Sequence, residues 1–161
     1  LHRRAGHLAE AEAHYRRALG ISQNQGAAQL EATIVAGLCL VLIAEFRYDE
    51  ALRELEVAWR MADVLGQVGA LAALHALSLP CAVVQKDRAG WAEHEARLFA
   101  RVNDEAVLDR AVIEAVELAG DLSQQAGDTE RARRSWSLAA RLFANAGLRD
   151  KAGALRAKAT D

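Results

Sequence analysis

Four alanines that recur about every forty residues limit the fold of this chain more than any other feature of its sequence. They lie at Ala11, Ala51, Ala92 and Ala132, with spacings of 40, 41 and 40 residues. A period of this length is typical of arrays whose units cannot bury an apolar face alone and must stack on their neighbours. We therefore expect tandem structural units of about forty residues along the whole chain.

The residues after each alanine repeat one apolar face. Apolar side chains recur four, seven and eight positions downstream, which is the spacing of one side of an α-helix. These residues are Tyr15, Ala18 and Leu19; Leu55, Ala58 and Trp59; Ala96, Phe99 and Ala100; and Trp136, Ala139 and Ala140. Small side chains on such a face let two helices approach closely. We predict that the four alanines are helix-packing positions.

Glycines mark where these helices should end. Gly26, Gly66 and Gly147 each follow one of the alanines by fifteen residues, and glycine most easily takes the left-handed conformation that terminates a helix. In the third repeat Asn103 comes only eleven residues after Ala92. We therefore expect the second helix of that repeat to be about one turn shorter, and the next helix to be longer.

The periodicity predicts eight helices. They cover residues 8–24, 27–45, 48–65, 67–86, 89–102, 105–126, 129–146 and 148–159. Composition agrees, because 52% of the residues are apolar, only 5% are aromatic, and Pro80 is the single proline. Alanine, leucine, glutamate and arginine, which dominate the chain, are strong helix formers.

The net charge and the cysteines limit which partners the chain can bind and which cellular compartment suits it. The net charge of −2 gives no basic field to gather nucleic acid or an anionic membrane. The uncharged runs 32–44 and 68–84 fit buried helices better than membrane spans. Cys39 and Cys81 have neither disulfide nor zinc spacing, and no segment has the pattern expected of a signal peptide. A reducing, cytoplasmic setting is expected.

Two segments resemble the core of the tetratricopeptide repeat. That core carries Leu-Gly at the waist of its first helix and Gly-Asp-Tyr-Glu-Glu-Ala across the turn. Residues 38–51 and 119–132 are similar to it, and the second segment matches at Gly120, Gly127, Asp128, Glu130 and Ala132. The forty-residue period resembles the longer-helix variety found in bacterial regulators such as the maltose activator and related signalling ATPases.

The third repeat departs from this pattern. Leu79 and Pro80 stand where Leu-Gly is expected, and Asp87 stands where the turn glycine falls. A proline inside a helix removes a backbone hydrogen bond and can kink it. We expect a kink in the first helix of that repeat.

The resemblance implies an all-α fold, a right-handed α-solenoid of helix-turn-helix repeats over residues 1–161. Its units would be a partial repeat at about 1–26, repeats at 27–66, 67–103 and 104–147, and a capping helix at 148–161. Residues Gly6 to Ala11 match the turn and the start of a second helix, which puts Leu1 in the middle of a first helix. The chain is therefore expected to be a fragment of a larger protein.

In tetratricopeptide proteins the first helix of each repeat lines a concave face that holds a peptide or a partner helix. By resemblance, this face would present Thr33, Ala36, Leu40, Ile43, Leu74, Leu77, Cys81, Val84, Glu114, Glu117, Asp121 and Gln124. Two interpretations remain open for its apolar part. It forms an open groove for a hydrophobic segment or a second copy of the chain, or it is buried against neighbouring repeats.

Motifs for catalysis or metal binding are not evident. The sequence has no Gly-rich phosphate loop, nucleophile elbow or His-Glu-x-x-His helix, since Leu98 stands where His94 would need a second histidine. Glu114, Glu117 and Asp121 share a helical face, which fits a solvated acidic surface better than an acid–base pair. We expect no catalytic residue, no metal and no cofactor.

These observations favour a non-catalytic protein-interaction scaffold within a bacterial regulatory or signalling protein. Its partner would be a protein, a peptide or a second copy of the chain, with neither nucleic acid nor membrane bound by this segment. The alternative is an effector-sensing module that controls an adjacent DNA-binding or catalytic domain. An open apolar trough would favour the first function, and a convergent polar cluster in an enclosed pocket would favour the second.

Overall fold

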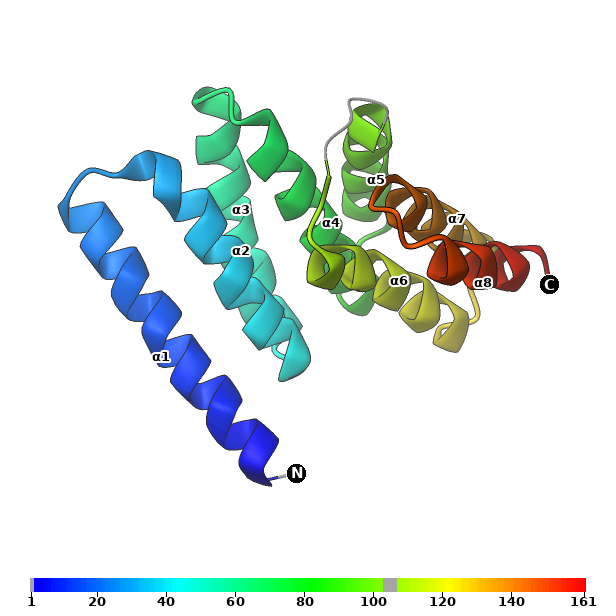
Figure 1. The fold of residues 1–161 in the computed structure, drawn as a ribbon, viewed down its shortest axis with the longest axis horizontal. Coiled ribbons are helices and arrows are strands. Elements are labelled where there is room, and N and C mark those ends of the chain that lie inside the picture. Colours follow the sequence, from blue (N-terminus) through cyan, green and yellow to red (C-terminus); the bar gives the residue numbers. More distant parts are fainter. Residues whose placement is uncertain (1, 103–106) are drawn as a thin grey trace. The chain divides into compact units, whose positions relative to one another are not determined.

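The computed structural model describes residues 2–102 and 107–161, and every regular element in these ranges is an α-helix (Figure 1). The helices are α1 (His2–Asn24), α2 (Ala28–Ala44), α3 (Tyr48–Val64), α4 (Val68–Val84), α5 (Arg88–Val102), α6 (Arg110–Gln125), α7 (Thr129–Asn145) and α8 (Arg149–Thr160). The predicted all-α fold of consecutive helix-turn-helix units is therefore confirmed. The predicted helix bounds agree within two residues everywhere except at the starts of α1 and α6.

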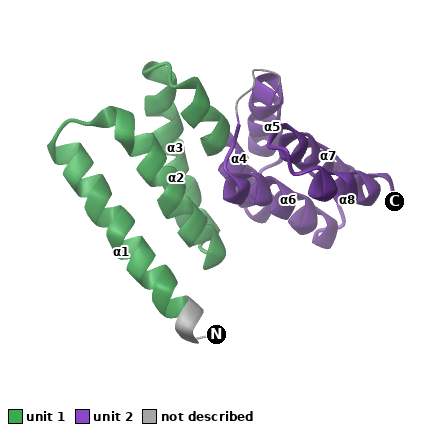
Figure 2. Cartoon of the chain, viewed as in Figure 1, with its two compact units in different colours: residues 1–74 green, residues 75–161 purple. Residues whose placement is uncertain are grey.

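The chain divides into two compact units, residues 1–74 and 75–161, with the boundary inside α4 (Figure 2). In the first unit α1 packs on α2 and α2 packs on α3. In the second unit α6 packs on α7, α7 packs on α8, and α5 also contacts α7. Within each unit, helices thus bury apolar faces against neighbouring helices.

Six of the described helices end in the same turn. The residue two positions beyond each of these helices has a positive φ, between 56° and 81°. These residues are Gly26, Phe46, Gly66, Lys86, Gly127 and Gly147. The next amide then donates back across the helix end, as Ala27 N does to Ser22 O at 2.9 Å and Gln67 N does to Ala62 O at 2.9 Å. This is the Schellman motif, and it confirms Gly26, Gly66 and Gly147 as helix terminators.

The register predicted for α5 is wrong by one residue. Ala51 and Ala132 are fully buried, but Ala92 is exposed, and so is the rest of its predicted face, which consists of Ala96, Phe99 and Ala100. Because α5 begins forty residues after α3, the position of Ala51 is taken in α5 by Trp91. The buried residues of α5 are Trp91, His94, Glu95, Leu98 and Val102. An indole therefore stands where the other repeats place a small side chain.

The expected start of α6 is also wrong. Asn103, the predicted terminator of α5, lies outside the described residues, as do 104–106. Residues 107–109 are not helical, and α6 begins only at Arg110. Asp109 has an extended N-cap conformation, with φ −60° and ψ 143°, which suits an aspartate that favours helix starts over helix interiors. As a result α6 has 16 residues and is not lengthened.

The turn expected near Gly6 is not present. Helix α1 runs through this residue, which lies outside the group of glycines with positive φ. The flanking residues are good helix formers and contain no proline, so nothing in the segment requires a break. Pro80 lies within α4, and the kink expected there stays a prediction.

Candidate functional site

The apolar part of the predicted concave face is mostly buried. On α2, Thr33 is exposed, Ala36 and Leu40 are half-buried, and Ile43 is buried. On α4, Leu74, Leu77 and Cys81 are completely buried and only Val84 is exposed. Only a few of these positions are therefore accessible to a partner in this structure.

The acidic part of that face is neutralised by lysines from α8. Lys151 Nζ lies 3.4 Å from Glu114 and 3.5 Å from Glu117, and Lys158 Nζ lies 2.6 Å from Asp121. Burial acts to raise the pKa of Glu114, but the Arg110 hydrogen bond and the Lys151 charge outweigh it and hold that pKa below its usual value. Gln124 remains exposed. The surface presented by α6 and α8 is thus a set of ion pairs.

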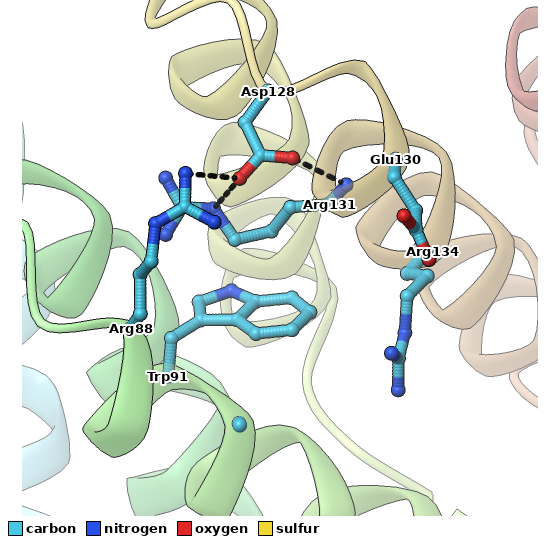
Figure 3. A pocket seen from close by; sticks show the side chains of 7 residues that line it. Arg88, Trp91, Asp128, Glu130, Arg131 and Arg134 are labelled. Atoms are coloured by element: carbon cyan, nitrogen blue, oxygen red, sulfur yellow. Dashed lines mark hydrogen bonds and ion pairs between the residues drawn. The ribbon is translucent and has the colours of Figure 1, made fainter.

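A pocket that the sequence did not predict lies at the starts of α5 and α7. This cavity, of about 200 Å³, is here called the arginine–tryptophan pocket (Figure 3). Its lining residues are Arg88, Trp91, Ala92, Asp128, Glu130, Arg131 and Arg134. All of them belong to the second compact unit. The pocket therefore combines three guanidinium groups with one indole ring.

Asp128 organises two of the arginines. It caps α7 by accepting a hydrogen bond from Arg131 N at 3.0 Å. Its other carboxylate oxygen lies 3.3 Å from Arg88 Nη2 and 3.6 Å from Arg131 Nε, and Figure 3 shows both guanidinium groups approaching that oxygen. Arg131 Nε also donates to Ser123 Oγ at 3.1 Å. One carboxylate thus faces two cations, one of which, Arg131, is only 8% exposed.

The indole ring of Trp91 lies beneath the guanidinium groups of Arg131 and Arg134. The indole is 5% exposed, and the guanidinium carbons of Arg131 and Arg134 lie 5.8 Å and 5.7 Å from its ring centroid. Cations in this position are attracted by the ring's electrons. Arg134 is also held by Glu95, to which its Nη2 donates at 2.6 Å and 2.9 Å. The charge of Arg134 is therefore compensated within the protein.

Two hydrogen-bond donors at this pocket are buried without an acceptor. Trp91 Nε1 and Arg131 Nη1 have no partner among the residues that the structure describes. Leaving a donor unsatisfied in the interior costs about 1–3 kcal/mol, and more for a charged group, so each such case requires an explanation. Both donors belong to residues that line one cavity, and an acceptor placed in that cavity is the explanation that the geometry favours.

A second cavity adjoins the first. It has a volume of about 440 Å³ and is here called the valine cavity, with lining residues Val83, Val84, Lys86, Arg88, Leu122, Gln125, Ala126 and Arg131. Arg88 and Arg131 line both cavities. The two hollows therefore flank one arginine pair, with aromatic surface on one side and aliphatic surface on the other.

A buried histidine pair lies between α4 and α5. His75 Nδ1 and His94 Nδ1 are 2.9 Å apart, and the two residues are 1% and 8% exposed. Burial lowers the pKa of His75 to about 3, with further lowering by the charges of His94, Arg101 and Arg97. One ring nitrogen donates and the other accepts, so the pair is a buried structural contact between the two helices.

The Cys81 thiol is a packing group, and the described residues form no metal site. Burial raises the pKa of the Cys81 thiol to about 12, and Cys81 Sγ donates to Leu77 O at 3.5 Å. The thiolate is the nucleophilic form of cysteine, so this side chain is inert at neutral pH. In residues 2–102 and 107–161 no three His, Cys, Asp or Glu side chains are arranged to hold a metal ion.

Sequence reasoning missed the pocket because its key residues lie forty positions apart. Neither Trp91 nor Arg131 belongs to a motif that the sequence alone marks as a binding site. The recurrence of helix starts at Arg88 and Thr129 is the signal that brings them together, since the contact between α5 and α7 places the first turns of these helices side by side.

Comparison with known proteins identifies no relative. No protein family, curated protein or solved structure matches the chain. Across the described ranges, no helix has both the length and the apolar character that crossing a membrane requires.

Proposed function

We propose that this chain is a non-catalytic helical-repeat module that binds a segment of a partner protein. We further propose that it belongs to the longer tetratricopeptide type and works in the cytoplasm within a bacterial regulatory or signalling protein. The observation that carries the binding role is the pair of buried donors, Trp91 Nε1 and Arg131 Nη1, beside a cavity open to the surface. A partner can supply the acceptor that the described residues, 2–102 and 107–161, do not provide.

The position of this pocket supports a protein ligand. It lies where two consecutive hairpins meet, at the first turns of α5 and α7, and it continues past Arg88 and Arg131 into the valine cavity. Together the cavities offer charged, aromatic and aliphatic surfaces in a row, as extended peptides require. The predicted concave face gives a partner less apolar surface to contact, because most of its apolar side chains are buried.

The chemistry of the buried groups supports a non-catalytic role. The Cys81 thiol is held protonated by burial, and the His75 imidazole, with its pKa lowered to about 3, cannot accept a proton at neutral pH. The carboxylates Glu95, Glu114 and Asp121 each contact a cation. The Cys81 and His75 side chains are therefore poor general acids and bases at neutral pH, because catalysis needs a pKa near the working pH.

Selection of binding peptides tests the function. The full chain, immobilised through a terminal tag, would be exposed to a random-peptide phage library. We expect peptides with a shared pattern that bind in solution by calorimetry and shift the amide resonances of α5 and α7. Enrichment of no pattern, or binding that is equal for folded and urea-unfolded chain, would overturn the proposal.

One observation favours the effector-sensing alternative. Polar groups from two helices converge on the arginine–tryptophan pocket, and its volume of about 200 Å³ suits a small anion better than a folded partner. In that case small organic acids would raise the melting temperature of the chain and no peptide would compete with them.

Sedimentation equilibrium of the free chain tests the further possibility of self-association, which predicts a concentration-dependent mass.

A further inference from the structure

The unpartnered donors at the arginine–tryptophan pocket specify the kind of atom that should occupy it. Trp91 Nε1 and Arg131 Nη1 can only donate, so the occupant must bring oxygen acceptors. The pocket lies at the starts of α5 and α7, where helix dipoles favour negative charge. An anionic oxygen group satisfies both requirements.

The charges around the pocket favour a single negative charge. Arg88 and Arg131 share one carboxylate, Asp128, which leaves one cation in excess. Arg134 is already matched by Glu95. Glu130 stands on the rim beside Arg134 (Figure 3). A dianion would be repelled by both Asp128 and Glu130, so a carboxylate fits this pocket better than a phosphate.

The valine cavity specifies what should be attached to that carboxylate. Val83, Val84 and Leu122 line it, and it shares Arg88 and Arg131 with the pocket. A group bound to the two guanidiniums therefore lies next to aliphatic surface. An aliphatic side chain on the same ligand would bury that surface, at roughly 25 cal/mol per Å².

We propose that Arg88, Arg131 and Trp91 bind a carboxylate of a partner segment whose adjacent aliphatic side chain enters the valine cavity. This inference rests on the proposed function and names the chemistry of its ligand. Two sources supply such a group, a peptide C-terminus that ends in an aliphatic residue and a Glu or Asp side chain next to one. A bidentate carboxylate can accept from both the guanidinium and the indole.

The indole proton of Trp91 provides a direct test. In proton–nitrogen spectra of the full chain, the Trp91 signal is assigned by its loss in Trp91→Phe and is thereby separated from those of Trp59 and Trp136. An acetylated peptide that ends in Leu with a free carboxylate is titrated, followed by its C-terminal amide and an amidated peptide with internal Glu-Leu. We expect a downfield shift of the Trp91 proton with a carboxylate-bearing peptide and none with the peptide that lacks it.

The first and third peptides distinguish the two sources. A shift with the free C-terminus alone assigns the site to chain ends, and a shift with Glu-Leu assigns it to acidic side chains. Sulfate serves as the dianionic comparator and should bind more weakly. A shift with sulfate that exceeds the shift with every carboxylate overturns the choice of ligand.

Variants connect the binding to the named residues. Arg88→Gln should lower the affinity for the peptide about tenfold, since a charge-assisted hydrogen bond is lost. The side chain of Arg88 is 81% exposed, so this variant should fold normally. Arg133→Gln, an exposed arginine on the same helix as Arg131, is the matched control and should bind like the parent chain. Glu130→Gln should strengthen binding by removing a nearby negative charge.

The outcomes separate this inference from the proposed function. If selected peptides bind α5 and α7 but leave the Trp91 indole unshifted and bind Arg88→Gln equally well, the carboxylate site is wrong and the interaction module stands. If neither selected nor carboxylate peptides bind, both are wrong. Equal weakening by Arg88→Gln and Arg133→Gln would show a diffuse charge effect and would also overturn the site.

Discussion

The indole ring of Trp136 in α7 lies directly against Gly120 in α6, where a β-carbon would collide with it. The same edge of the ring is held by its Nε1, which donates to Oδ1 of the adjacent Asp121 at 3.0 Å. In the first unit Gly37 of α2 meets the ring of Tyr15 in the same way. A glycine in one helix thus accommodates an aromatic ring from its neighbour in both units.

Gly120→Ala should therefore destabilise the fold despite alanine's better helix propensity. The added methyl group forces Trp136 to shift and strains its hydrogen bond, at a cost of about 1–3 kcal/mol. Gly153→Ala is the matched control, because nothing lies within 4 Å of a β-carbon there, and it should gain about 0.5–1 kcal/mol. Urea unfolding measures both. A gain in both variants would mean that the contact is not tight.

Glycine at the two non-glycine turn positions should stabilise the chain. Phe46 and Lys86 have φ of 62° and 56°, a conformation that costs other residues about 1–2 kcal/mol. Phe46→Gly and Lys86→Gly should each gain about 1 kcal/mol, since Phe46 is 79% exposed and little packing is lost. Gly66→Ala, at an equivalent turn, should lose a similar amount. Thermal melts of the three variants check the signs.

The fold could be predicted because short stretches of sequence determine where each helix ends and which of its faces is apolar. Helix ends can be predicted from glycines because glycine tolerates a positive φ, as it does at Gly26, Gly66 and Gly147. The register of α5 could not be read in this way, because Ala92 offered a small residue one position from the true packing site and Trp91 took that site instead. Residue identity suggested a register, while the position of the turn at Lys86 determined it.

The candidate site is less predictable because it depends on orientation between helices. Nothing in the sequence near Arg131 indicates that its Nε is held by Asp128 and Ser123 while its Nη1 finds no acceptor in the part of the chain that the structure describes. The shared helical face of the acidic positions on α6 can be read from the sequence, but their pairing with Lys151 and Lys158 depends on the packing of α8. Long-range pairing of this kind has no local signal.

Tryptophan substitutions can establish the register directly. Ala51→Trp should cost about 1–3 kcal/mol, because Ala51 is fully buried between helices and has no room for a larger side chain. Ala96→Trp, on the face of α5 that the sequence marked as packing, should change stability by less than about 0.5 kcal/mol because Ala96 is exposed. Similar losses in both variants would restore the register predicted from the alanine spacing.

The buried histidine pair should make the free energy of unfolding depend on pH even at pH values above those where carboxylates titrate. With the pKa of His75 lowered to about 3 in the folded chain from its ordinary value of 6.5, the unfolded state binds more protons between these two values. The free energy of unfolding therefore falls as pH decreases below about 6.5, by up to ~1.4 kcal/mol per pH unit.

Urea unfolding at about pH 7 and about pH 5 measures this loss, which should shrink in His75→Asn whatever the stability of that variant at neutral pH. The groups that face His75 are His94, Arg97 and Arg101, whose positive charges oppose its protonation. His7, exposed on α1, supplies the control, and His7→Gln should leave the dependence unchanged. An identical dependence in the parent chain and His75→Asn would mean that the pair does not carry the effect.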